Sequence, residues 1–576
     1  MSVLGSMASQ RAEKSRAVYR PHVLSILLWL ALAIAPARTL RALLTVLLGK
    51  RVRGWNLLYL AAADHPFYYD HWVRRGEPHL RQAFLDSCQA SEPLSIGCLI
   101  LSVGEDAAAW ATLKSVREAL PLTMPIWTDV AALADDGVTV IARETPLIQL
   151  LDSIRSADWL LTLRAGDLVS PALGQVLRHA APKPADHSVV FWDEDAWCAG
   201  RRQHPWIKPG WDPILFRARD GVTGSGLTAT RAVRSHSGGA YFDAAGFAQV
   251  VAGLLAEDGV GPLHIPLILT HRLDGAPFVQ RDLHARIVEN NPGALLPVTP
   301  KIWPVVSIII PTRDRADLLE TCLTGLARLT YPGPIELLIV DNDSVEARTE
   351  ALFANAERDG ARILRRPGPF NYAALTNHAV SMASGEILCL LNNDIEMIDG
   401  DWLTHMVRYA IIDCVGAVGA RLLYPSGEIQ HVGIAIGIGG AAGHVQKGVD
   451  PADTKRFEWH AYSRIVSAVT GACMVVARSK FEAVDGMDSK GFAIDFNDVD
   501  FCLRLKTLGL TNIFAVEATL IHQESKSRGS TRSPEGAEQF AHELKLLRSR
   551  WHTEGLDDPH YSPMFRRECE RCILAF

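Results

Sequence analysis

Three apolar runs in the C-terminal half of the chain each stop abruptly at polar residues. The runs and their endings are 305–310 before Pro311, Thr312 and Arg313, 335–340 before Asp341, and 387–391 before Asn392, Asn393 and Asp394. Apolar runs of this length predict buried strands, and the helical spacing of leucines at 316–329 predicts a crossover helix between the first two. Parallel strands end at one edge of a sheet, where α/β proteins bind ligands. We therefore expect Thr312, Asp341 and Asp394 to converge there.

The length of the chain predicts several domains, because 576 residues are too many for one hydrophobic core. Prolines at 292, 297, 300 and 304 indicate a linker. The predicted parts are an apolar helical segment at 1–90, an α/β domain at 91–280, a linker at 281–303, a second α/β domain at 304–555 and a tail at 556–576.

Composition limits the class of partner and the compartment. The chain is 48% hydrophobic and 21% charged with a net charge of −6, so it has no overall positive field and we expect no nucleic-acid partner. The ten cysteines are scattered, which fits a reducing compartment better than a disulfide framework. Cys569 and Cys572 form a lone C-x-x-C motif without the second pair that a structural zinc site needs.

The N-terminal segment has basic residues on both sides of an apolar run at 23–35. This run is shorter than the roughly 20 residues that span a bilayer. A secretory signal has a similar pattern. We favour a cytoplasmic protein with peripheral contact at the inner face of the plasma membrane, while a helix packed on the next domain is an equal alternative.

Six segments in order between residues 306 and 529 resemble the motifs of family 2 glycosyltransferases. They are VSIIIPTRDR, ELLIVDNDS, GEILCLLNND, TGACMVVAR, NDVDFCLRL and IHQESKSRG. The resemblance is to tandem enzymes of bacterial surface-polysaccharide synthesis, including rhamnosyltransferases. It implies a GT-A fold with a Rossmann-like, mostly parallel sheet. It also implies inverting, metal-dependent transfer from a nucleoside-diphosphate sugar of UDP or dTDP type to a glycan or lipid-linked acceptor.

The resemblance assigns donor contacts to the strand ends. Pro311, Thr312, Arg313 and Asp341 would cradle the nucleotide, and Asn377 resembles a position beside it. The alternative for Asp341 is an Asx turn, and the alternative for Asn377 is an exposed helix residue.

A cation site is implied by the same resemblance. Asn392-Asn393-Asp394 matches the family's D-x-D motif with an amide in place of the first acid, so Asp394 would carry the contact to Mg²⁺ or Mn²⁺. In some GT-A enzymes a histidine at the position of His522 completes the metal shell. Arg528 lies in a basic loop that could fold over the diphosphate.

An acidic helix start at 497–500 resembles the place of the general base. Asp498 matches the base, which takes the proton of the attacking hydroxyl. The alternative for Asp498 is a helix N-cap, and we expect a structural role for Asp500.

Residues 91–280 resemble a degenerate copy of the same domain. The segment 158–167 resembles the strand that ends in D-x-D, but Arg164 and Gly166 replace the two carboxylates, so we expect an inactive domain for acceptor binding or packing. The acidic trio at 193–195 indicates either a rival metal site or a solvated cluster.

Two other functions stay open. A sugar nucleotidyltransferase usually has a Gly-rich loop after the first strand, and the loop at 311–315 contains no glycine. A non-catalytic glycan-binding or scaffold protein would not need to keep both Asp394 and Asp498.

Overall fold

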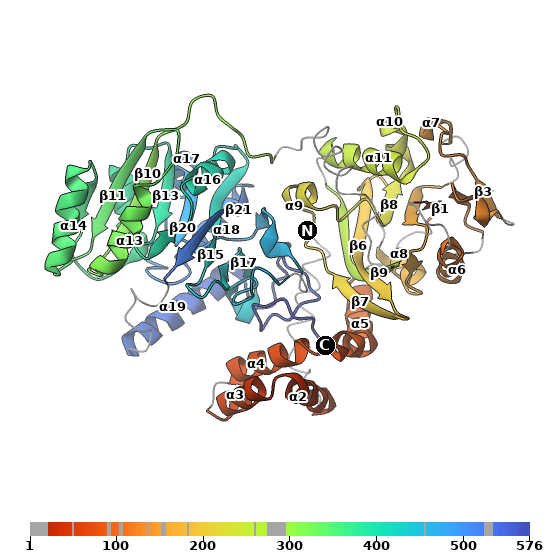
Figure 1. Ribbon diagram of the computed structural model, residues 1–576, viewed down its shortest axis with the longest axis horizontal. Coiled ribbons are helices and arrows are strands. Elements are labelled where there is room, and N and C mark those ends of the chain that lie inside the picture. The colour runs from red at the N-terminus through yellow and green to blue at the C-terminus, as the bar shows by residue number, and fades with distance from the viewer. Residues whose placement is uncertain are drawn as a thin grey trace. The chain divides into compact units, whose positions relative to one another are not determined.

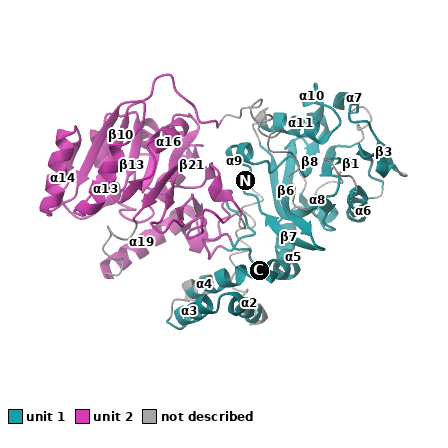
Figure 2. Ribbon diagram, viewed as in Figure 1, with its two compact units in different colours: residues 1–294, 561–566, 573–576 teal, residues 295–560, 567–572 magenta. Residues whose placement is uncertain are grey.

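The computed structural model describes residues 21–48, 51–88, 94–102, 108–121, 123–134, 137–150, 157–180, 182, 184–257, 261–273, 295–453, 457–523 and 534–576. The chain divides into two compact units (Figure 2). Unit 1 comprises residues 1–294, 561–566 and 573–576, and unit 2 comprises residues 295–560 and 567–572. The tail predicted at 556–576 is therefore shared between the two units.

Unit 2 alternates strands and helices from its start (Figure 1). Its strands are β10 (Val306–Thr312), β11 (Ile335–Asp341), β12 (Arg362–Arg365), β13 (Ile387–Leu391), β14 (Ile395–Met397), β15 (Val415–Leu423), β16 (Ile429–His431), β17 (Ile434–Ile436), β18 (Ala442–His444), β19 (Arg464–Val466), β20 (Cys473–Ala477) and β21 (Thr511–His522). Its α-helices are α13 (Ala316–Leu326), α14 (Ala347–Arg358), α15 (Tyr372–Met382), α16 (Trp402–Ala410), α17 (Arg478–Ala483), α18 (Asn497–Thr507) and α19 (Pro534–Trp551).

The core of unit 2 lies around one mixed sheet. Among the described residues its strand order is β12-β11-β10-β13-β20-β15-β21-β14, with β16 beside β15 and β19 beside β21. The α/β fold class is confirmed. The predicted parallel arrangement holds for β12, β11, β10 and β13 and for the β15–β21 pair, whereas β20 and β14 run antiparallel to their neighbours.

The apolar runs explain why these strands occupy the centre. All five residues of β13 are buried, as expected for a strand covered on both faces. α13 buries Leu318, Leu319 and Cys322, which lie on one face of the helix at spacings of three and four residues. α15 packs on β10 and β11, and α16 and α18 pack on β15 and β21.

Unit 1 also contains a mixed sheet with covering helices (Figure 1). Its strands are β1 (Ile96–Leu101), β2 (Ile126–Thr128), β3 (Val138–Val140), β4 (Trp159–Arg164), β5 (Leu168–Val169), β6 (Val189–Cys198), β7 (Arg201–Trp206), β8 (Gly226–Ala229) and β9 (Leu263–Leu273). Its α-helices are α2 (Pro21–Ile34), α3 (Pro36–Leu47), α4 (Arg51–Ala63), α5 (Phe67–Ser87), α6 (Ala109–Ala119), α7 (Leu147–Leu150), α8 (Leu173–Ala180), α9 (Pro213–Ala218), α10 (Thr230–His236) and α11 (Ala244–Glu257).

The two sheets share one strand topology, apart from β19, which has no counterpart among the described strands of unit 1. The strand order in unit 1 is β3-β2-β1-β4-β8-β6-β9-β5 with β7 beside β6, and each strand matches the one at the same place in unit 2. The parallel and antiparallel senses of corresponding pairs also agree. The resemblance of residues 91–280 to the later domain is therefore a likeness of topology as well as of sequence.

The first helices are short. α2 has 14 residues and α3 has 12. Among the described helices, none is both long and apolar enough to cross a membrane.

A buried carboxylate joins α18 to α19. Asp500 is fully buried and accepts hydrogen bonds from Arg504 Nε at 2.8 Å, Arg550 Nη1 at 2.8 Å and Trp551 Nε1 at 2.9 Å. Three donors balance the charge of this carboxylate in the protein interior. Asp500 therefore has the structural role that the sequence predicted.

Replacing Asp500 tests this role. We expect Asp500→Asn to lower the free energy of unfolding of unit 2 by about 3–5 kcal/mol, because two guanidinium groups would lose a buried partner. Chemical denaturation followed by circular dichroism measures the change. Asp401→Asn is the matched control, since Asp401 is exposed and pairs with His405, and it should cost less than about 1 kcal/mol. Equal effects of the two substitutions would contradict the structural role.

Candidate functional site

The carboxyl ends of β10, β11 and β13 form one edge of the unit 2 sheet. Thr312 lies opposite Asp341 in parallel register, and Asn393 follows β13, the other neighbour of β10. Asn393 Nδ2 donates a hydrogen bond to Thr312 Oγ1 at 2.8 Å. All three residues are buried. The structure thus brings the polar strand ends together, as the sequence predicted.

A carboxylate and an imidazole face each other at the same edge. β14 and β21 form an antiparallel pair in which Ile395 lies opposite His522. Asp394, the residue before Ile395, therefore lies beside the imidazole ring of His522. Asp394 Oδ1 and His522 Nε2 are 3.0 Å apart, and both residues are buried. His522 Nδ1 lies 2.8 Å from Gln430 Oε1, which can only accept, so Nδ1 carries a proton and donates it to the amide oxygen. The two residues predicted as metal ligands are therefore adjacent.

The spacing of this pair fits a divalent cation. Adjacent ligands of an octahedral cation with bonds of about 2.1 Å lie about 3.0 Å apart. Asp394 Oδ1 and His522 Nε2 have this separation. In the described part of the chain no group of three or more His, Cys, Asp or Glu side chains could hold a metal. The pair can thus supply two ligands, and the others would have to come from water, phosphate or an amide such as Asn392.

Asp498 is tied to the same part of the sheet through two neighbouring backbone residues. Gly471 N donates to Asp498 Oδ2 at 2.9 Å. The next residue, Ala472, accepts a hydrogen bond at 2.9 Å from the N–H of Asn392, at the end of β13. α18 starts at Asn497 and no side chain caps it, so Asp498 is not an N-cap. Its half-buried carboxylate instead contacts the segment beside β13.

The carboxylate of Asp341 is already engaged. Oδ1 accepts from Ser344 N at 3.0 Å, a local bond to the residue three positions on rather than the two-residue Asx turn named as the alternative, and Oδ2 pairs with Arg365 at 2.8 Å. Arg365 also pairs with Glu350. The carboxylate neighbours and their hydrogen bonds raise the pKa of Arg365 and keep it charged. Contact with a nucleotide would therefore involve Arg365 as well as Asp341.

Three other predicted residues lie in different settings. Asn377 on α15 donates to Met487 O at 2.7 Å and accepts from Met487 N at 2.9 Å, so its amide holds a neighbouring loop. Pro311 is buried within β10, and Arg313 is exposed just beyond its end. Arg528 lies outside the described residues.

The sequence reasoning missed Glu543, which is fully buried on α19. Its carboxylate accepts hydrogen bonds from the N–H groups of Ala493, Ile494 and Asp495, at 2.9, 3.2 and 2.6 Å. These residues immediately precede α18, which carries Asp498. No local pattern marks Glu543, because its partners lie about fifty positions earlier; the one signal is an acid on the apolar side of an amphipathic helix.

A pair of histidines, His431 and His444, lies next to Gln430 in the structure. Burial lowers the pKa of His431 well below its usual value, and His444 lowers it further. The Nδ1 atoms of His431 and His444 are 3.0 Å apart, so one ring donates to the other. His431 Nε2 lies 3.5 Å from Thr470 N, next to the Gly471 that binds Asp498. This pair therefore borders the segment that holds Asp498, the predicted general base.

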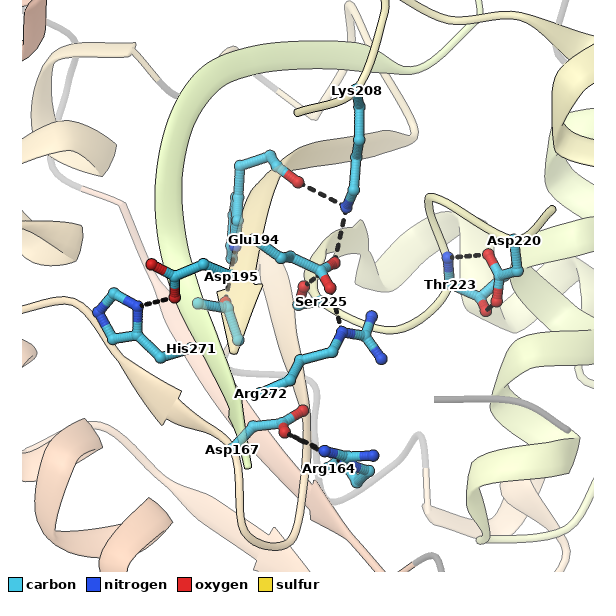
Figure 3. A network of polar contacts seen from close by, with 12 residues as sticks. Arg164, Asp167, Glu194, Asp195, Lys208, Asp220, Thr223, Ser225, His271 and Arg272 are labelled. Atoms are coloured by element: carbon cyan, nitrogen blue, oxygen red, sulfur yellow. Dashed lines mark hydrogen bonds and ion pairs between the residues drawn. The ribbon is translucent and has the colours of Figure 1, made fainter. Parts of the chain in front are cut away.

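Unit 1 keeps a carboxylate at the place of Asp394. β5 and β9 pair with Leu168 opposite His271, which gives Asp167 and His271 the positions of Asp394 and His522. The sequence reasoning placed the lost carboxylates at Arg164 and Gly166 and missed Asp167. Arg164 Nη2 pairs with Asp167 Oδ1 at 2.7 Å, and Figure 3 shows this pair beside Arg272. Arginine side chains thus neutralise the acid, and His271 instead contacts Asp195 at 2.6 Å.

The acidic trio at 193–195 is neither solvated nor free to bind a metal. Asp193, Glu194 and Asp195 are buried on β6. Figure 3 shows Glu194 and Asp195 with their partners. Glu194 pairs with Lys208 at 2.6 Å and with Arg272, while the other two acids each have a histidine partner. The sequence indicated either a metal site or a solvated cluster at these positions. The structure instead shows a buried network of ion pairs.

Comparison with known proteins identifies the class of domain. Residues 307–484, which lie within unit 2, match the model of the family described as Glycosyl transferase family 2. The O-antigen biosynthesis protein RfbC of Myxococcus xanthus is 32% identical over 450 residues, which cover 72% of this chain and 34% of that protein. The protein y4gI of Sinorhizobium fredii is 41% identical over 274 residues, 47% of this chain and 30% of that protein. The chain thus matches about a third of the length of each of these relatives.

Solved glycosyltransferases are also similar to part of this chain. The mannosyltransferase of Pyrobaculum calidifontis, solved with GDP-Man and Mn²⁺, is 19% identical, covers 46% of this chain and 68% of its own, and has a TM-score of 0.33. GalNAc-T7, solved with UDP, GalNAc and Mn²⁺, is 12% identical, covers 43% and 50%, and has a TM-score of 0.35.

The ion network of unit 1 gives a stability prediction. We expect Arg272→Met to lower the free energy of unfolding by about 3–5 kcal/mol, because it removes one of two cations from buried Glu194. Thermal and denaturant unfolding measure the loss. Arg348→Met is the control, since the Arg348–Glu320 pair is exposed and should contribute at most about 1 kcal/mol. A smaller loss for Arg272→Met than for the control would rule out a structural network.

The same network gives a direction for pH dependence. Burial alone would raise the pKa of Glu194, but Arg272 and Lys208 outweigh it and lower the pKa to about 2 from its ordinary 4.5. A carboxyl with a depressed folded pKa stabilises the fold fully above its unfolded pKa. We therefore expect this contribution to be lost as the pH falls from about 4.5 towards 2.

Proposed function

We propose that unit 2 is an inverting, metal-dependent glycosyltransferase. It would move a sugar from a nucleoside-diphosphate sugar, of UDP or dTDP type, to a glycan or lipid-linked glycan in bacterial surface-polysaccharide synthesis. The observation that carries the proposal is the buried Asp394–His522 pair, 3.0 Å apart, at the carboxyl edge of the sheet. The family match of residues 307–484 and the O-antigen biosynthesis relative support it. Rhamnosyl transfer is one special case.

Donor binding is proposed at the strand ends. Thr312 and Asn393 offer a hydroxyl and an amide at the edge of the sheet, already joined by a hydrogen bond. Arg313 is exposed beside them, and Asp341 carries Arg365 as a charged partner. Such groups suit the ribose and the phosphates of a nucleotide.

Asp394 and His522 would hold Mg²⁺ or Mn²⁺. The cation would stabilise the negative charge that develops on the departing diphosphate. Gln430 Oε1 accepts a hydrogen bond from the Nδ1–H of His522, which leaves Nε2 facing Asp394. A second hydrogen bond of this kind commonly fixes the ring of a metal-binding histidine. Asn392 and Asn393 add amide oxygens but no charge.

Asp498 would act as the general base. The acceptor oxygen would form a bond to the anomeric carbon as the bond from that carbon to the diphosphate oxygen breaks, which inverts the configuration in one displacement. The proton of the acceptor hydroxyl would pass to a carboxylate oxygen of Asp498. The N–H of Gly471 holds Asp498 Oδ2 and orients the carboxylate. Asn377 and Glu543 would act at a distance, through the loops that they hold.

The two other functions are less well supported. The loop at 311–315 has no glycine for a nucleotidyltransferase, and a pure scaffold would not need a carboxylate–imidazole pair at the sheet edge. Unit 1 has this scaffold character, because arginines occupy its corresponding site. We place the protein in the cytoplasm, since all ten cysteines are free thiols and a reducing compartment preserves them.

The general-base role is tested by Asp498→Asn. We expect transfer to fall by about 10²–10⁴-fold, because the acceptor hydroxyl would lose its proton acceptor. Binding of UDP or dTDP with Mn²⁺, measured by thermal shift, should not change. Asp401→Asn is the control and should keep full activity. If the wild-type chain neither binds nor hydrolyses any sugar nucleotide with Mn²⁺, the glycosyltransferase proposal fails.

The metal role has a matched control within the chain. We expect Asp394→Asn to weaken Mn²⁺ binding in the presence of UDP at least tenfold, because an amide supplies no charge. Asp167→Asn, at the corresponding position of unit 1, should leave Mn²⁺ binding unchanged, because Arg164 already neutralises that acid. Electron paramagnetic resonance of free Mn²⁺ measures both variants. Equal losses in the two variants, or no loss in either, would contradict the assigned ligands.

A further inference from the structure

An unusual number of large apolar side chains is exposed on α2 and α3. Eight of the 22 exposed large hydrophobic residues in the described part of the chain lie between positions 26 and 48. They are Ile26, Trp29, Leu32, Ile34, Leu40, Leu44, Leu47 and Leu48, which together we name the α2–α3 apolar face. Leu47 and Leu48 are 82% and 77% exposed. Monomeric soluble proteins rarely expose so many apolar side chains in one place.

The helical period separates this face from a buried one. Leu27, Leu30 and Ala31 are buried on α2, whereas Trp29 and Leu32 are exposed. On α3, Thr39 and Ala42 are the buried positions. α2 and α3 both pack on α4, which Figure 1 shows beside them. One side of the pair therefore supports the fold and the other presents apolar side chains to its surroundings.

The sequence that carries this face is mostly basic, although Asp64 lies 3.6 Å from Arg38. Residues 14–63 contain no acidic residue. They contain eight basic residues, namely Lys14, Arg16, Arg20, Arg38, Arg41, Lys50, Arg51 and Arg53. Arg38 and Arg41 lie on α3 among the exposed leucines, and both are exposed. Two copies of such a surface would repel each other, whereas an anionic surface would attract it.

We propose that the α2–α3 apolar face binds the surface of a membrane rich in anionic phospholipid. Helices of 14 and 12 residues are too short to span the roughly 30 Å hydrocarbon core. They can lie in the interface, where apolar side chains enter the acyl region and arginines reach the phosphates. Lipid binding of this kind goes beyond the sugar-transfer reaction and is independent of it, so either proposal can fail without the other.

Vesicle co-sedimentation of the full chain tests the proposal. We expect the protein to pellet with vesicles of phosphatidylglycerol and phosphatidylcholine, and to bind pure phosphatidylcholine at least tenfold more weakly. Trp29→Ser, Leu40→Ser, Leu44→Ser and Leu47→Ser, combined in one variant, should abolish pelleting. Arg38→Gln with Arg41→Gln should weaken binding to the anionic vesicles by roughly fivefold for each arginine.

A control variant removes three exposed apolar side chains elsewhere. Trp110→Ser, Ile148→Ser and Ile302→Ser lie outside the α2–α3 apolar face, and all three side chains are exposed. This variant should pellet like the wild type. Circular dichroism of each variant shows whether it is folded, and a misfolded quadruple variant would be replaced by the single substitutions Leu44→Ser and Leu47→Ser.

Three outcomes would overturn the proposal. The wild type could stay in the supernatant with anionic vesicles, or the quadruple variant could pellet as well as the control. Light scattering could also show that the wild type forms a dimer that the quadruple variant cannot form, without any lipid binding. In that case a second copy of the chain would cover the face.

Discussion

A carboxylate buried at the end of a central strand requires a positive charge beside it, and both units of this protein are built around this requirement. In unit 1 Asp167 meets it internally, with the guanidinium of Arg164 at 2.7 Å. In unit 2 Asp394 has His522 at 3.0 Å. Leu391 precedes Asp394 by three residues, as Arg164 precedes Asp167, but a leucine carries no charge. A low-dielectric interior does not tolerate an uncompensated acid. Arginine therefore neutralises the carboxylate of Asp167 in unit 1, whereas the corresponding carboxylate of Asp394 in unit 2 is suited to a cation.

The residues around the proposed site in unit 2 hold it without taking part in the chemistry. Asp500 fixes α18 against α19, and Glu543 binds three backbone N–H groups just before α18 begins. Gln430 sets the orientation of the His522 ring. Each of these groups restricts a side chain or a loop that the proposed reaction needs in one position, which is how a folded protein preorganises a site. The chemistry would therefore depend on α19, which follows the matched family segment in the chain.

Much of the site could be predicted from local patterns, and the errors have a common cause. The polar strand ends follow from where the apolar runs stop, whereas the partnership of Asp394 with His522 was implied by the family resemblance. The setting of Asn377 was harder to predict, because its side-chain amide hydrogen-bonds the backbone of Met487, over a hundred residues later. The acidic trio on β6 was misjudged for the same reason. Its cationic partners come from β7, β9 and their neighbouring loops, and no spacing in the sequence joins them.

By itself the sequence determined the α/β class, the polar ends of the strands and the family motifs, because hydrophobic period and strand length are local properties of the chain. Only the tertiary structure decided which charges become partners. It gave Asp167 an arginine and Asp394 a histidine, it bound Glu543 to the loop before α18, and within the described residues it left apolar side chains of α2 and α3 exposed. The physical reason is that burial and charge pairing depend on which residues are neighbours in space, and residues far apart in the chain become neighbours only when the sheets form.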